Sequence, residues 1–129
     1  MTLAGITRAI GYFEQSVARD PEYTLAYAGM AECYAILPIS YDVPVMEILP
    51  KALSSSARAV QLDDSLAEAH ASVGAVKVWM EWDWEGAEAA LRRAIDLNPS
   101  YLQAHWWYAV TLSAAIWRKN EHSGSRTHG

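Results

Sequence analysis

The chain has 129 residues, of which 52% are apolar and 19% charged, enough apolar material for one domain with a core and too much for a disordered tail. Ten Lys and Arg against fifteen Asp and Glu give a net charge of −5, which argues against nucleic acid as a partner. Cys33 is the single cysteine, so an internal disulfide is excluded, and no apolar run reaches the length of a membrane span.

The first half of the chain predicts two helices and then an unusual connection. Apolar residues at helical spacing predict a helix over 6–19, closed before a proline because the residue preceding proline avoids the α region. A second helix is predicted over 24–37, with a threonine as its N-cap. Three prolines then punctuate 38–50, which we expect to be an extended connection with room for a short helix over 45–49.

The second half predicts four more helices and a polar tail. A helix is expected over 50–62 with proline as its first residue, and further helices over 67–80, 84–97 and 102–117. The expected organisation is an array over 1–117: a partial repeat 6–21, a repeat 24–64 with the long connection, a repeat 67–99 and a half repeat 102–117, followed by a disordered polar tail over 118–129.

The helices follow an internal repeat. Ala67-Glu68-Ala69-His70 and Leu102-Gln103-Ala104-His105 are similar segments 35 residues apart. The alanine, leucine, alanine and proline at positions 87, 91, 94 and 99 have the same spacing as Ala9, Phe13, Ser16 and Pro21. This pattern resembles the tetratricopeptide repeat, with two departures: the proline-rich connection and one extra residue in the Trp82–Trp84 turn. The resemblance implies an all-α solenoid, a right-handed superhelix of about six antiparallel helices.

A narrower resemblance concerns a class of bacterial signalling proteins. The stretches Leu25–Ala31, Ala67–Ser72 and Asn98–Ala109 are similar to repeats that follow a winged-helix regulator, a nucleotide cyclase or a serine/threonine kinase domain. In that class the array is the sensory or partner-binding half of the protein. The resemblance therefore implies a regulatory context and supplies no catalytic residue.

Candidate chemistry is sparse. The sequence has no phosphate loop, no dinucleotide glycine motif and no nucleophile elbow, so we expect no enzyme, no catalytic residue, no cofactor and no metal. His70 and His105 occupy equivalent repeat positions, and we expect their ring nitrogens to be satisfied by a neighbouring carbonyl or acid. We interpret Cys33 as a small buried hydrophobe and Asp83 as part of an acidic turn that caps the following helix.

The expected function is protein recognition in a concave groove lined by the first helix of each pair. Leu25, Val78, Trp79 and Trp106 are predicted apolar anchors, although packing of the tryptophans on the next helix is an equal alternative. Two glutamates favour basic residues in the partner, which is a peptide or a helix. The full expected groove comprises Leu25, Glu32, Glu68, Ala71, Val78, Trp79, Gln103, Trp106 and Val110.

Two alternatives stay open at this stage. One is a homo-oligomer that associates through exposed terminal helices carrying Trp107, Leu112 and Trp117. The other is a small-molecule or enzymatic pocket under the 38–50 connection. Nucleic acid and direct membrane contact are not expected. The cytoplasm is the default location, with an extracytoplasmic one if a parent protein has a membrane span. The residues expected to converge in the pocket under the 38–50 connection are Tyr34, Tyr41 and Met46.

Overall fold

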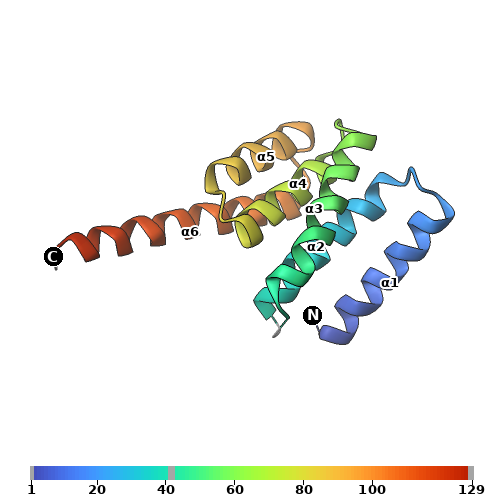
Figure 1. Ribbon diagram of the computed structural model, residues 1–129. Helices are drawn as coiled ribbons and strands as arrows, with labels where there is room; N and C mark the ends of the chain where they lie inside the picture. The colour runs from blue at the N-terminus through green and yellow to red at the C-terminus, as the bar shows by residue number, and fades with distance from the viewer. Residues whose placement is uncertain (1, 41–42, 128–129) are drawn as a thin grey trace.

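The protein is all-α in this computed structural model, which describes residues 2–40 and 43–127, with side chains over 2–38 and 43–121. No strand occurs within these ranges, and the helices follow one another with short connections (Figure 1). The elements are α1 (Leu3–Arg19), α2 (Thr24–Ser40), α3 (Val45–Leu62), α4 (Ala67–Val76), the π-helical turn η1 (Lys77–Glu81), α5 (Trp84–Leu97) and α6 (Leu102–Thr127).

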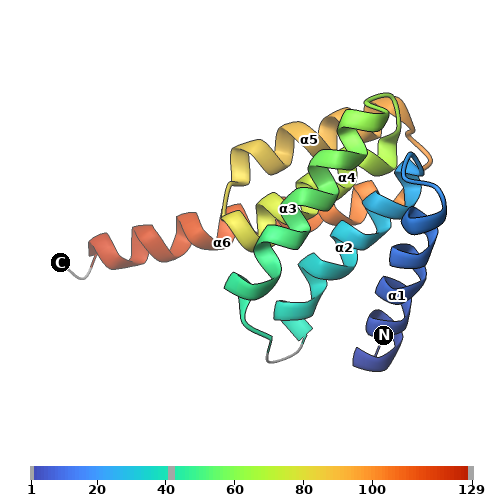
Figure 2. The same cartoon turned by 45° about the vertical axis from the view of Figure 1, so that its right-hand side comes forward.

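Consecutive helices run in alternate directions and pack side by side (Figures 1 and 2). The pairs α2–α3 and α4–α5 contact each other most extensively, and α4 also contacts α2 and α6. This arrangement makes α4 the central helix, and its small residues are buried by neighbours on every side. The core runs through all layers, from Ile6 on α1 through Leu91 on α5 to Trp107 on α6.

Three turns between helices repeat the same hydrogen bonds. The side-chain Oδ1 of Asp20, Asp63 and Asn98 accepts from the backbone N–H two residues later, at 3.1, 3.0 and 3.1 Å. The backbone N–H of each of these residues donates to the carbonyl four positions earlier and so closes the preceding helix. Short polar side chains that accept from the following backbone are typical of tight turns. The turns after α1, α3 and α5 are therefore equivalent.

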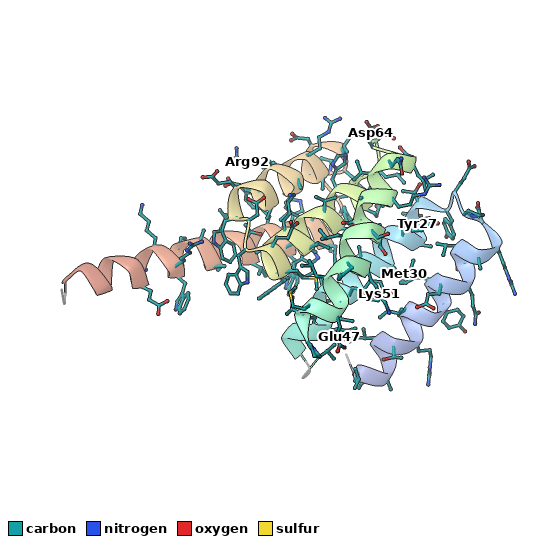
Figure 3. The ribbon with its side chains drawn as sticks, in the orientation of Figure 1. Tyr27, Met30, Glu47, Lys51, Asp64 and Arg92 are labelled. Atoms are coloured by element: carbon teal, nitrogen blue, oxygen red, sulfur yellow. The ribbon has the colours of Figure 1, made fainter. Side chains whose placement is uncertain are left out.

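A second contact recurs just after each of these turns. The Tyr27 hydroxyl donates to the Pro21 carbonyl at 3.1 Å, and Figure 3 shows Tyr27 on α2 near the α1–α2 turn. The His70 and His105 Nε2 atoms donate to carbonyls six residues earlier, at 2.7 and 2.8 Å. The expectation that a neighbouring carbonyl satisfies the ring nitrogens is confirmed for the Nε2 atom of each histidine. Tyr27, His70 and His105 therefore make equivalent contacts, each with the carbonyl six residues earlier.

The α4–α5 pair is close because Gly74 has no side chain. A Cβ built on Gly74 would lie 2.5 Å from Leu91 Cγ, closer than real carbon atoms approach. Leu91 is fully buried in this contact. The glycine is needed here for space, since the helix backbone of α4 touches the leucine directly.

The proline-rich connection is shorter than expected: the short helix expected over 45–49 forms, but as the first part of α3, and the predicted helix start at Pro50 was wrong. α2 continues through Pro38, and α3 begins at Val45, so Pro50 lies inside α3 rather than at its start. A proline removes one intrahelical hydrogen bond and clashes with the carbonyl four residues earlier. Buried Leu37 and Ala52 beside the two prolines keep both helices packed on the core, which offsets the local loss.

The fourth predicted helix changes its geometry at its end. Regular helix stops at Val76, and the π-helical turn carries the chain to Glu81. The N–H groups of Trp82 and Asp83 both donate to the Lys77 carbonyl. A π turn widens the helix by one residue, which absorbs the extra residue noted in the sequence. Asp83 then caps α5, because its Oδ1 accepts from the Gly86 N–H at 2.9 Å, as expected.

The C-terminal segment also differs from expectation. α6 continues to Thr127, whereas a disordered tail was predicted over 118–129; residues 128–129 lie outside the described part. No proline or turn motif like those after α1 and α5 follows Trp117, so nothing in the sequence stops the helix there. Its second half projects beyond the other helices (Figures 1 and 2). Across the described helices, none is both long and apolar enough to cross a membrane.

Candidate functional site

The residues of the expected groove lie on α2, α4, η1 and α6, but not all of them are accessible. Ala71 and Val78 are buried, with Val78 only 1% exposed, so the expectation that Val78 anchors a partner is wrong. Both belong to the α4–η1 segment, which neighbouring helices cover. Leu25 is exposed and Trp106 is 54% exposed. The half-buried members are Glu32, Glu68, Trp79, Gln103 and Val110.

Glu32 and Gln103 meet although 71 residues separate them. The Gln103 Nε2 donates to Glu32 Oε2 at 3.5 Å, which links α6 to α2 beside the central helix. The other carboxylate oxygen, Glu32 Oε1, is buried and makes no hydrogen bond of standard geometry; the nearby Trp107 indole N–H, also buried and without such a bond, interacts with the carboxylate only weakly. Glu68 on α4 and Tyr101 before α6 complete this cluster, because the charges of both glutamates act on the tyrosine. We call Glu32, Glu68, Tyr101 and Gln103 the acidic site.

Burial controls the chemistry of the acidic site. It raises the pKa of Glu32 to about 7, and repulsion from Glu68 adds to the rise. The Gln103 amide and the Trp107 indole oppose the shift by favouring the ionised carboxylate. Burial, followed by the two glutamates, also raises the pKa of Tyr101. The ion pairs of the described residues join lysine or arginine to Glu81, Asp83 and Glu88, so neither glutamate of the site has a cationic partner there.

The adjacent tryptophans have different roles. Trp107 is fully buried and packs edge-to-face against Trp106, with ring centroids 4.7 Å apart, and against Trp79 at 6.4 Å. Trp107 is therefore part of the core and not free to contact a second copy, as the self-association alternative required. Trp106 keeps an exposed surface, whereas Trp79 packs between helices. Trp106 therefore fits the prediction of an exposed anchor, and Trp79 fits the alternative of packing against a neighbouring helix.

One cavity of the structure was not predicted from the sequence. A cavity of about 350 Å³ lies where η1 and the start of α5 meet α6. Trp82 and Trp84 contact each other edge-to-face there, with centroids 5.5 Å apart. The clustering of all six tryptophans between positions 79 and 117 was the available signal. We call this the tryptophan pocket, lined by Trp79, Trp82, Trp84, Ala114, Trp117 and Arg118.

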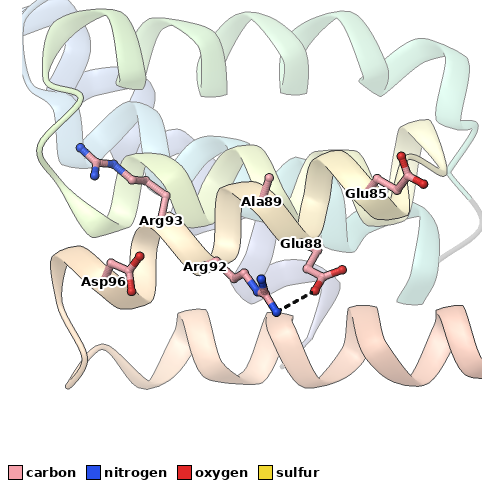
Figure 4. Close-up of a pocket in the computed structure, with 6 residues that line it drawn as sticks. All are labelled: Glu85, Glu88, Ala89, Arg92, Arg93 and Asp96. Carbon is pink, nitrogen blue, oxygen red and sulfur yellow. Dashed lines mark ion pairs between the residues drawn. The ribbon is translucent and has the colours of Figure 1, made fainter.

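The outer face of α5 carries a shallower groove of about 460 Å³ (Figure 4). Its charges compensate each other: Arg92 Nη2 lies 3.4 Å from Glu88 Oε1, and Arg92 Nε donates to the Tyr108 hydroxyl at 3.2 Å. The Tyr108 hydroxyl in turn donates to Glu88 at 3.4 Å. Glu88, Arg92 and Tyr108 therefore satisfy one another, and the other charged residues of the groove, Glu85, Arg93 and Asp96, are exposed to solvent, so none of them is a buried, unpaired group like Glu32.

The pocket expected under the 38–50 connection does not form from its described members. Tyr34 is buried, with its hydroxyl 4.0 Å from Met30 Sδ, while Met46 is 78% exposed. Tyr41 lies outside the described residues. The two described side chains therefore do not converge on a common site.

Cys33 and the acidic residues offer no nucleophile or metal site. Cys33 is half-buried, and burial followed by the Glu32 charge raises the pKa of its thiol to about 11. A thiol with this pKa is almost entirely protonated at neutral pH and reacts poorly. Among the residues that the structure describes, no three His, Cys, Asp or Glu side chains are grouped so as to hold a metal ion.

Comparison with known proteins adds no family assignment. No family model matches the chain, and no curated protein matches it. Inference about its role therefore depends on the internal repeat, the acidic site and the tryptophan pocket.

Proposed function

We propose that the chain is a tetratricopeptide-like array and acts as a non-catalytic scaffold that binds a segment of a partner protein on the α2–α4–α6 face. The recurring turn contacts support the repeat: three turns share one hydrogen-bond pattern, and Tyr27, His70 and His105 share another. In repeat arrays of this kind, neighbouring helix pairs build extended surfaces suited to peptides or helices.

We further propose that the partner supplies a lysine or arginine to the acidic site. The observation that carries this proposal is a buried Glu32 carboxylate with no cationic partner, one oxygen of which makes no hydrogen bond of standard geometry, next to a second glutamate. Buried carboxylates are normally paired with a cation, because desolvation of an unpaired charge is unfavourable. An incoming ammonium or guanidinium group would provide the missing charge.

The surroundings of Glu32 are compatible with such an exchange. The contact from Gln103 is 3.5 Å long and joins an amide to a carboxylate, so a charged donor competes with it favourably. Trp106 on the next turn of α6 offers an exposed aromatic surface of the type enriched at binding hot spots. A partner helix with one basic and one apolar residue a turn apart matches these two features.

The experiment uses a fluorescein-labelled amphipathic 16-residue peptide of leucine and glutamine with one central lysine, titrated with the full chain. A peptide with norleucine in place of the lysine controls for apolar binding. We expect the lysine peptide to bind at least about tenfold more tightly, and Glu32→Gln to remove that difference. The matched control is Glu85→Gln, which makes the same change of charge at an exposed position in the first turn of α5.

Two results would contradict the proposal: equal binding of both peptides, or an unchanged preference in Glu32→Gln. The pH dependence provides a second check. Because the pKa of Glu32 is about 7, the carboxylate is largely protonated at pH 6 and largely ionised at pH 8. The preference for lysine should therefore increase between these values in the wild type and not in Glu32→Gln.

A place in a bacterial signalling protein follows from the resemblance of the repeats, and we propose it on that basis. Self-association is the second candidate, because Ile116 and Trp117 are exposed on the part of α6 that projects from the other helices (Figure 2). Light scattering over a concentration series tests it. A mass that stays monomeric up to about 1 mM would exclude self-association through this helix.

A further inference from the structure

The tryptophan pocket is built by uncommon backbone geometry. The π-helical turn η1 precedes Trp82, which has φ 56° and ψ 28° and is the one non-glycine residue with positive φ in the described part of the chain. A bulky side chain rarely adopts this left-handed conformation, and π turns are frequent at functional sites. Together these features bring Trp79, Trp82 and Trp84 to one wall within six positions of sequence.

The opposite wall comes from α6 and leaves space. Ala114 contributes only a methyl group, and Trp117 lies one turn further along the helix. The cavity of about 350 Å³ falls within the range of roughly 300–1,000 Å³ found for small-molecule sites. Trp82 and Trp117 remain 66% and 65% exposed, so a large aromatic surface stays in contact with water. A bound apolar group would remove part of that surface from water.

The charged residues around the tryptophan pocket indicate which kind of ligand it would bind. Arg118 is the one charged residue at the pocket; the cavity surface is wholly apolar, so Arg118 contributes its aliphatic stem to the wall, and its guanidinium takes part in none of the ion pairs among the described residues. The nearby acids Glu81 and Asp83 lie within 3.9 and 3.4 Å of the Lys77 ammonium instead. Indole faces attract cations, but a neighbouring guanidinium repels them and attracts a carboxylate.

We propose that the tryptophan pocket binds a small apolar monocarboxylate, with its hydrocarbon part against the indole rings and its carboxylate paired with Arg118. This site is separate from the acidic site, which is built from other residues and attracts the opposite charge. The proposal therefore stands or falls independently of the proposed function.

The experiment compares three eight-carbon probes on the full chain: octanoate, 1-octanol and octyltrimethylammonium. Binding is followed by tryptophan fluorescence and by calorimetry in low salt, below the concentrations at which the two ionic probes form micelles and below the solubility limit of 1-octanol. We expect saturable binding of octanoate with a dissociation constant on the order of 1 mM, a value typical of a ligand with so few atoms. Octanol should bind at least about fivefold more weakly.

Variants assign the interaction to the pocket. Arg118→Gln should weaken the binding of octanoate at least about fivefold and leave the binding of octanol unchanged. Lys119→Gln makes the same change of charge one residue further along α6 and should have little effect on the binding of either probe. Trp82→Ser should weaken both probes by removing an aromatic wall, and circular dichroism would verify that each variant is folded.

Three results would overturn the proposal. Equal binding of octanoate and octanol, with no effect of Arg118→Gln, would indicate a purely apolar surface. Tighter binding of octyltrimethylammonium would indicate an aromatic site for cations. An absence of saturable octanoate binding up to about 20 mM, a concentration well above the expected dissociation constant, would show that the cavity holds no such ligand.

Discussion

The burial of Glu32 predicts a measurable cost to stability that depends on pH. Its folded-state pKa is about 7, against an ordinary value of 4.5, so between these values the folded chain binds a proton that the unfolded chain releases. Stability therefore falls as the pH rises from about 4.5 to 7. One pKa unit corresponds to about 1.4 kcal/mol, so the full shift corresponds to about 3 kcal/mol.

Glu32→Gln tests this directly, because glutamine has nearly the same shape and does not ionise. At pH 4.5 both folded proteins are neutral at this position and the unfolded wild type is only half ionised, so the substitution should change the free energy of unfolding little. At pH 8 the wild type has a buried carboxylate and the variant does not. We therefore expect the variant to gain about 2–3 kcal/mol relative to the wild type between the two pH values.

The assay is urea unfolding of both proteins at several pH values, followed by circular dichroism. The difference between them cancels the titration of every other group, and Glu85→Gln provides a surface control with the same change of charge. The reasoning would be refuted if the stability difference between wild type and Glu32→Gln were the same at pH 4.5 and pH 8. A gain at high pH alone would support the view that the acidic site trades stability for a binding function.

Two further predictions concern packing and reactivity. Gly74→Ala should lower the free energy of unfolding in urea by about 1–3 kcal/mol, because the new methyl group would overlap Leu91. The control Gly11→Ala on α1, where no atom lies within 4 Å of the new Cβ, should leave that free energy unchanged or raise it by up to about 1 kcal/mol. Equal effects of the two substitutions would contradict the close α4–α5 contact. Cys33, with a thiol pKa of about 11, should react with iodoacetamide at pH 8 at least about tenfold more slowly in the folded chain than in urea; comparable rates would show that the thiol is not shielded.

Local patterns allowed much of the helical layout to be predicted. Helical periodicity and turn residues located six helices, and α5 occupies the expected range Trp84–Leu97. The histidine contacts and the Asp83 cap were also predictable, because each involves a partner within six residues along the chain. Interactions at this range depend on backbone geometry that a short segment already defines.

Predictions failed where local preference competes with packing. Pro38 and Pro50 favour breaks, yet both lie inside helices because neighbouring residues are anchored in the core. Polar composition after Trp117 suggested disorder, although no residue in that segment stops the helix. The extra residue in the Trp82–Trp84 turn was visible in the sequence, but whether a loop or a π turn would absorb it was not.

The sequence by itself determined the number of helices, most of the turns that cap them and the repeated pattern of residues, since those properties depend on residues close together along the chain. Only the tertiary structure decided which side chains are accessible and which meet. Trp106 and Trp107 are neighbours in sequence, but one is exposed and the other is in the core, because a helix turns successive side chains to different sides. Glu32 lost solvent and acquired its raised pKa because α4 and α6 pack beside α2, and that arrangement depends on the whole core.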